Sequence, residues 1–148
     1  MILLIHLLFG AAIGSVVKNI TLGLFLAFSS HYLLDALPHV DYPIKNIKEK
    51  QWRRALPDAL KVILDISLAL LLLLIFSTNK PIVYVYGLIA VVPDGLTLLG
   101  YLFSNKFLEK HYNLHQKIHF LKNAKISIFW RFASQIIILF VSIVLLSL

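Results

Sequence analysis

The residues best suited to chemistry begin in one stretch, from Ser30 to Pro43, which places two histidines and two aspartates at the end of an apolar segment. His31 and Asp35 are four residues apart, so on a helix their side chains share one face. An ionisable side chain inside a membrane segment costs about 2.5–3.5 kcal/mol on insertion scales, so two on one face require a shared partner. A divalent metal ion would satisfy both groups; a His–Asp hydrogen bond at the helix end is the alternative.

Further candidate ligands flank this pair. His39 and Asp41 follow Pro38, which breaks a helix, so both are expected in the turn that leaves the helix. His39 could bind the same ion, whereas Asp41 is more typical of a loop carboxylate. His6 could add a ligand from the first apolar segment, or it could be a histidine at the membrane interface.

Two more candidate groups lie later in the chain. His115 and His119 form H-x-x-x-H, a spacing that lets imidazoles on adjacent helical turns bind one ion, although a solvated interfacial helix has the same pattern. His111 continues this stripe among lysines and is expected to be solvated. Asp94 follows Pro93 where Val-Pro-Asp-Gly is expected to interrupt an apolar helix. Asp94 could be a ligand or bridging carboxylate, or it could cap the amides freed by the break.

Acidic and basic residues also gather before and within the third apolar segment. Asp58, Lys61 and Asp65 lie on one stripe of a helix. Asp65 is deep enough to need a partner, so it is either paired with Lys61 or a catalytic carboxylate. Arg53 and Arg54 would suit a substrate anion, although membrane topology alone also explains basic residues there.

The composition indicates that membrane helices hold these residues. Of 148 residues, 59% are hydrophobic and 14% are charged, where soluble domains have about 25% charged residues; the mean hydropathy is +0.86. The first apolar segment could also be a signal peptide, but it has no basic n-region and no clear small-x-small cleavage site, so a short transmembrane helix is expected. Its Gly10 and Gly14 form a G-x-x-x-G that would let another helix approach closely. We expect one all-α integral membrane domain, 1–148, with about five transmembrane helices at 2–17, 20–37, 58–77, 82–103 and 126–148, and polar loops at 38–57 and 104–125.

Charge and cysteine content narrow the chemistry. The chain has no cysteine, so a metal must be held by His, Asp, Glu and carbonyl groups. The net charge of +7 does not indicate nucleic acid, because ten Lys and Arg residues lie in the stretches 38–56 and 104–125, against only Lys18 and Lys80 in the other two connections. The positive-inside rule puts these loops and the N-terminus in the cytoplasm and the C-terminus outside, with anionic membrane lipids as the partner.

The ionisable side chains then share one depth. His6, His31, Asp35, Asp65 and Asp94 all fall within roughly 5–15 Å of the cytoplasmic surface, given the rise per residue of a helix. The outer half of the predicted bundle contains no Asp, Glu or His. A polar site on the cytoplasmic side of an apolar bundle is therefore predicted.

These motifs resemble one family. The segment Ser30–Asp35 is similar to the S-H-x-L-L-D segment of the YdjM-like inner-membrane metal-dependent hydrolases. The other similar motifs are a histidine before a Gly-rich helix, a Pro-Asp pair and an H-x-x-x-H pair, which here are His6, Pro93–Asp94 and His115/His119. The last two follow the first motif here and precede it in that family. The resemblance implies a metal-dependent hydrolase of the cell inner membrane.

The sequence thus favours a hydrolase that acts on a phosphoester or lipid-linked substrate at the cytoplasmic leaflet. Asp65 or Asp94 would serve as general base, and Arg53 and Arg54 would hold the substrate's anion. A non-enzymatic ion or proton carrier, or a scaffold with a structural metal, would use the same cluster. One or two divalent ions, Zn²⁺ by preference, would be held by His31, Asp35, Asp94, His115 and His119, with His6 or His39 contributing.

Overall fold

The computed structural model describes residues 1–77, 81–121 and 125–148, and these form helices joined by turns and loops, with no strand among them. The all-α prediction is therefore confirmed for the part of the chain that is described. Three residues of the predicted turn before Pro81, among them Lys80, and Lys122 of the second basic loop lie outside the described residues.

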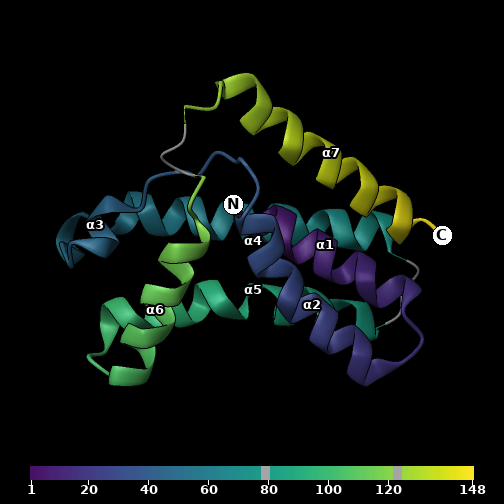
Figure 1. Ribbon diagram of the computed structural model, residues 1–148, viewed down its shortest axis with the longest axis horizontal. Helices are drawn as coiled ribbons and strands as arrows, with labels where there is room; N and C mark the ends of the chain where they lie inside the picture. Colours follow the sequence, from purple (N-terminus) through teal and green to yellow (C-terminus); the bar gives the residue numbers. More distant parts are fainter. Residues whose placement is uncertain (78–80, 122–124) are drawn as a thin grey trace.

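Five apolar helices lie close to their predicted positions (Figure 1). Three of them, α4, α5 and α7, are long and apolar enough to cross a membrane. The other two, α1 and α2, have 14 and 16 residues, fewer than the roughly 20 that a full span needs. Membrane-spanning helices are thus supported, but not all five predicted spans. The bounds are α1 Leu3–Val16, α2 Ile20–Asp35, α4 Leu56–Phe76, α5 Pro81–Leu102 and α7 Ile128–Leu146.

The two predicted polar loops contain short helices. The first holds α3 (Lys45–Lys48) and the single-turn 3₁₀ helix η1 (Trp52–Arg54), and the second holds α6 (Lys106–Ile118). The Asn105 side chain starts α6 by accepting a hydrogen bond from the Phe107 amide at 2.7 Å. The second loop is therefore mostly a helix, as the spacing of its histidines allowed.

Helix α1 is the centre of the bundle, because α2, α4, α5 and α7 all contact it. Its close approach to α5 depends on glycine: a Cβ on Gly87 would lie 2.9 Å from the Leu7 carbonyl oxygen, and one on Gly10 would collide with Ala90 and Tyr86. The close helix approach predicted at Gly10 is confirmed. The enclosure of α1 by protein on four sides explains why this helix can be short: little of it needs to face lipid.

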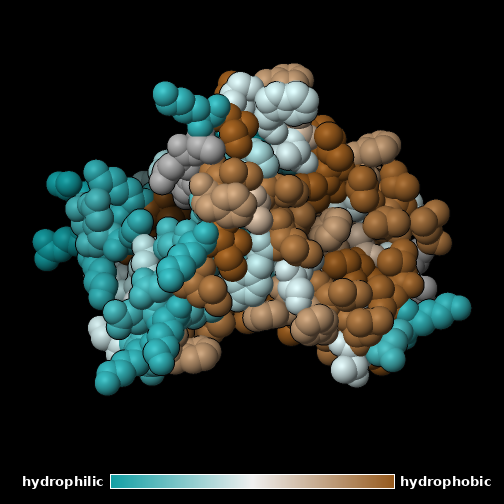
Figure 2. Space-filling model, in the orientation of Figure 1, coloured by the Kyte–Doolittle hydropathy of each residue, from teal (hydrophilic) through white to brown (hydrophobic). Residues whose placement is uncertain are grey.

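The polar connections gather at one end of the bundle. There α2 ends, α4 begins, and α5 turns into α6 (Figure 1). In Figure 2 the hydrophilic residues are concentrated over this end, where α3 and α6 lie, while most of the rest of that face is hydrophobic. This segregation agrees with a bundle that has an apolar body and one polar end.

Helix α7 fastens the extended segment that leaves α2. The Gln135 side-chain amide donates to the Val40 carbonyl at 3.0 Å and its oxygen accepts from the Val40 amide at 3.3 Å. The Ser134 hydroxyl donates to the Pro38 carbonyl. These contacts fix the backbone on both sides of His39, a candidate ligand.

Replacing Gly87 with Leu should push α1 and α5 apart, because the new side chain has no room against the Leu7 carbonyl. Overpacking of this kind costs about 1–3 kcal/mol, so thermal unfolding of the detergent-solubilised protein should begin at a clearly lower temperature. Gly100→Ala is the matched control, since its Cβ would lie 3.7 Å from Leu108 Cβ, an ordinary contact. Equal stability of the two variants would contradict the close packing described here.

Candidate metal centre

The Asp35 carboxylate is the hub of a buried group of histidines. It lies at the end of α2 and is 1% exposed. Its Oδ2 atom lies 2.8 Å from Nε2 of His115, 3.1 Å from Nε2 of His31 and 3.2 Å from Nε2 of His119. Its Oδ1 atom faces the Met1 amino group at 2.5 Å and His6 Nε2 at 3.2 Å. Three helices and a chain segment thus meet at one carboxylate.

The surroundings of two histidines aim their Nε2 atoms at Asp35. His31 Nδ1 lies 2.8 Å from the Ala90 carbonyl oxygen, which can only accept, so Nδ1 carries the proton of a neutral His31 ring. His115 Nδ1 lies 2.8 Å from the Thr97 hydroxyl, which donates to the Pro93 carbonyl at 3.1 Å. A neutral His115 ring protonated at Nδ1 would donate to this hydroxyl and leave Nε2 free to bind a metal ion. Partners of this kind fix the tautomer and ring orientation of histidines that ligate metals.

The two Nε2 atoms so oriented lie 3.1 Å apart. When both rings are neutral and protonated at Nδ1, neither nitrogen has a proton to offer the other or the nearby Asp35 oxygen, and a cation between the three groups would remove their repulsion. Asp94 Oδ1 completes the set at 3.7 Å from His31 Nε2 and 3.9 Å from His115 Nε2. His31, Asp35, Asp94 and His115 form a group whose ligand atoms all lie within 4.8 Å of one another, the donor set of a zinc-like site.

A second group shares Asp35. It consists of Asp35, His39 and His119, again with ligand atoms within 4.8 Å of one another. His119 caps the end of α6, one turn beyond His115, so the H-x-x-x-H spacing supplies one ligand to each group. His39 Nδ1 lies 2.7 Å from the Leu37 carbonyl, which places the proton of a neutral ring on Nδ1, and its Nε2 atom lies 3.3 Å from Asp41 Oδ1.

His6 lies beside these groups rather than in them. Its ring is fully buried, stacks on His31 with ring centroids 4.0 Å apart, and contacts Asp35 through Nε2. His6 Nδ1 has no hydrogen-bond partner. The ring belongs to α1 and packs against the ligand group, so His6 supports the ligands.

Asp65 is apart from both groups, and Lys61 is not its partner. The Tyr42 hydroxyl donates to Asp65 Oδ2 at 3.1 Å, whereas Lys61 pairs with Asp58 at 3.2 Å. Burial, followed by the charge of Asp65, raises the pKa of Tyr42 and keeps this hydroxyl a donor. Asp65 also faces the amides at the start of α1, those of Leu3 and Leu4. It therefore joins α1, α4 and the first loop.

The remaining candidates lie at the surface of the polar end. Arg53 and Arg54 are exposed on η1. His111 is half-buried rather than fully solvated, and its Nε2 atom lies 3.2 Å from the Tyr32 hydroxyl. Burial, followed by the neighbouring His115, lowers the pKa of His111. His111 belongs to neither ligand group.

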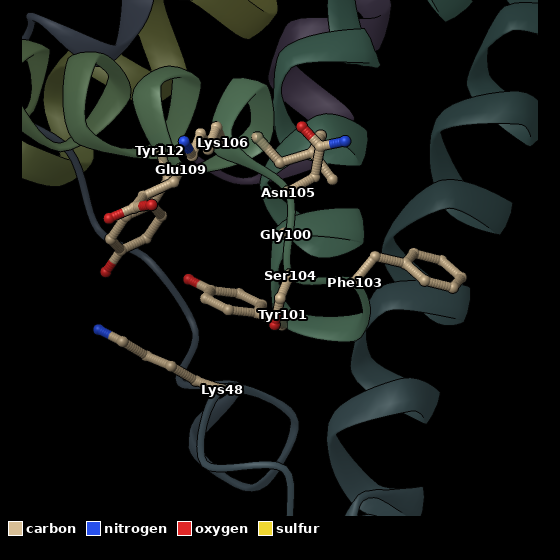
Figure 3. Close-up of a pocket in the computed structure, with 10 residues that line it drawn as sticks. Lys48, Gly100, Tyr101, Phe103, Ser104, Asn105, Lys106, Glu109 and Tyr112 are labelled. Atoms are coloured by element: carbon tan, nitrogen blue, oxygen red, sulfur yellow. The ribbon is translucent and has the colours of Figure 1, made fainter.

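A pocket of about 540 Å³ opens beside the centre, between the end of α5, the start of α6 and α3 (Figure 3). The rings of Tyr101 and Tyr112 lie on its wall with centroids 5.9 Å apart, and Lys48 faces them from the other side. Tyr101 is two helical turns beyond Asp94, and Tyr112 is one turn before His115. The pocket therefore adjoins the ligand groups along the α5–α6 contact without containing them.

The residues that support the candidate ligands were not predicted from the sequence. Thr97 and the Ala90 carbonyl orient the two histidines, and Gln135 holds the segment that carries His39. Thr97 lies four residues after Pro93, a spacing that places its hydroxyl over the Pro93 carbonyl, and this was the one available signal. Helix α5 is also continuous from Pro81 to Leu102 with Pro93 inside it, where an interruption was expected.

In the part of the chain that the structure describes, fold and site together define an all-helical protein with three helices long and apolar enough to span a membrane and a His/Asp cluster that could hold a metal ion. No protein-family model matches the chain, and comparisons with curated proteins and with solved structures find no significant match. The resemblance to the YdjM-like hydrolases thus stays a prediction.

Replacing Thr97 with Val should weaken metal binding without removing a ligand. The His115 ring loses the hydroxyl that fixes its tautomer, and changes of this kind cost about 10–100-fold in metal affinity. Competition with a fluorescent zinc chelator measures the effect. Thr21→Val, on the exposed start of α2, is the control and should bind zinc like the wild type. Identical affinities would show that Thr97 does not orient a ligand.

Metal binding should also depend on pH with a definite sign. Imidazole binds metal only when neutral, so protons compete with the ion as the pH falls through the usual histidine pKa of about 6.5. We expect the purified protein to retain zinc at pH values above about 7 and to release it on dialysis near pH 5, as measured by mass spectrometry of the metal. His31→Ala combined with Asp35→Ala should contain little zinc at either pH.

Proposed function

We propose that this protein is a membrane-embedded metal-dependent hydrolase that acts on a phosphoester or lipid-linked substrate at the cytoplasmic leaflet. The observation that carries the proposal is the convergence of two imidazole Nε2 atoms, 3.1 Å apart, on a buried carboxylate. A bound divalent ion would lower the pKa of a water molecule to about 7 and polarise the bond to be cleaved.

The exposure of the ligands favours a catalytic metal ion over a purely structural one. The side chains of His31 and Asp35 are 0% exposed, whereas that of Asp94 is 29% exposed. An ion held here would be closed off by protein on the side of α2 and reachable on the side of Asp94. Catalytic sites keep such an open position, and structural sites do not.

Each residue of the cluster then has its own role. His31, His115 and Asp35 would hold the ion, and the hydrogen bonds of His31 and His115 to α5 would keep these two ligands in place. Asp94, at the open side, either completes the ligand set or accepts a proton as general base. Asp65 is the second candidate base, although its contacts with Tyr42 and the start of α1 favour a positioning role.

Surface features support a location at the inner leaflet. Phe129, Trp130 and Phe132 at the start of α7 are 67%, 62% and 50% exposed, and Trp52 in η1 is 51% exposed. Aromatic residues of this kind concentrate where a membrane meets water. This level coincides with the polar end, whose basic residues would face the cytoplasm and anionic lipid headgroups. A lipid-linked substrate could therefore reach the cluster from the bilayer, with Arg53 and Arg54 near its anionic group.

The main competing function is an ion or proton carrier. A carrier needs polar groups along a path through the membrane. The segments 7–30, 66–93 and 120–148, which form the rest of the apolar helices, contain no Asp, Glu or His. The cluster is therefore at one end of an apolar body, which favours a hydrolase.

The proposal is tested by assaying the zinc- or manganese-loaded protein in detergent against phosphomonoesters, phosphodiesters and lipid phosphates. Asp94→Asn keeps the size of the side chain but removes the negative charge, and we expect it to lower the rate by about 10²–10⁴-fold. His111→Ala, on the same face of α6 but outside both ligand groups, should retain most of the activity. Absence of hydrolysis by metal-loaded protein across all three substrate classes would overturn the proposal.

A further inference from the structure

We infer that the cluster binds two divalent cations bridged by Asp35, an inference that rests on the proposed metal-dependent function and narrows its substrate to a phosphoester. Two observations call for a second ion: the two ligand groups share only Asp35, and the second group contains a buried histidine nitrogen, His39 Nε2, that has no hydrogen-bond partner.

The first ion accounts for only part of the histidines. His31, His115 and Asp35 supply three ligand atoms with Asp94 at the open side of the group, which is enough for one catalytic zinc ion. His119 is left over, yet its Nε2 atom lies 3.2 Å from the same Asp35 oxygen. That nitrogen belongs to a second arrangement of ligands around Asp35.

His39 shows that the second arrangement is built for a cation. Its side chain is 2% exposed, and its Nε2 atom has no hydrogen-bond partner. The contact of Nδ1 with the Leu37 carbonyl puts the ring proton on that side, so Nε2 presents a lone pair to the Asp41 carboxylate 3.3 Å away. A buried lone pair facing a carboxylate is unfavourable, and a metal ion between them removes the repulsion.

Side chains of α7 fix the backbone of the segment that carries His39. Gln135 of α7 binds both backbone groups of Val40, and Arg131 donates to the His39 carbonyl at 3.4 Å. Loops are usually free to move, and this one is fixed at the residue that would bind the second ion. His119 is fixed differently, as the cap of α6.

Asp35 is suited to act as the bridge. Its Oδ2 atom lies 2.8–3.2 Å from histidines of both ligand groups, so this one oxygen could contact both ions. Asp94 stands beside the first group and Asp41 beside the second. Two-metal sites stabilise both the attacking and the leaving oxygen of a displacement at phosphorus, which is why they are typical of phosphoesterases.

The number of bound ions tests the inference. Purified protein is loaded with Zn²⁺, dialysed, and its metal-to-protein ratio is measured by mass spectrometry. We expect about two ions in the wild type, about one in His39→Gln or His119→Gln, and nearly none in Asp35→Ala. His111→Ala, which removes a histidine outside both groups, is the matched control and should keep both ions.

A measurement on the wild type avoids any variant that fails to fold. With Mn²⁺ as the probe, electron paramagnetic resonance should show an exchange-coupled pair rather than isolated ions. A single zinc ion that survives both His39→Gln and His119→Gln, or an uncoupled Mn²⁺ signal at full loading, would overturn the two-ion site alone. Two bound ions without phosphoester hydrolysis would overturn the proposed function and leave the two-ion site intact, whereas protein that takes up no metal would overturn both.

Discussion

The buried carboxylate of Asp35 is the constraint on which the polar end of this protein depends. A carboxylate removed from water needs compensating charge or hydrogen bonds. One of its oxygens has the Met1 amino group, but the other faces three imidazole nitrogens. The His31 nitrogen carries no proton when its ring is neutral, because Nδ1 donates to the Ala90 carbonyl. A cation would satisfy these groups together, and the elements around them bring imidazoles to that oxygen.

Helix packing and site geometry are linked through α5. Glycines at positions 10 and 87 let the backbones of α1 and α5 approach closely, and α5 also places the Ala90 carbonyl 2.8 Å from Nδ1 of His31 on α2. Three residues later Pro93 supplies the carbonyl that holds the Thr97 hydroxyl. One face of one helix thus sets the orientation of histidines from two others, and a shift of α5 would alter both rings together.

Local patterns in the sequence predicted what depends on local geometry. The apolar segments, the helical spacing of His115 and His119 and the end of α2 before Pro38 all follow from periodicity and proline chemistry. The predictions that were wrong concern features that depend on tertiary contacts. The short α1 is possible because other helices surround it. Asp65 is paired with Tyr42 rather than with Lys61, because the loop that contains Tyr42 folds over Asp65. No spacing rule finds a glutamine on the last helix that binds a loop nearly a hundred residues earlier.

The order of the ligands along the chain has a consequence for biosynthesis. His31 and Asp35 emerge from the ribosome long before His115 and His119, and the helix that fastens His39 comes last of all. A nascent chain that stops before α6 therefore holds the Asp35 carboxylate in an apolar bundle without His115 and His119, two of the four histidines that contact it. A metal ion bound by the complete cluster would be captured only after the last third of the chain is made, and it would join that part to the first third. Metal binding would thereby distinguish a finished molecule from a truncated one.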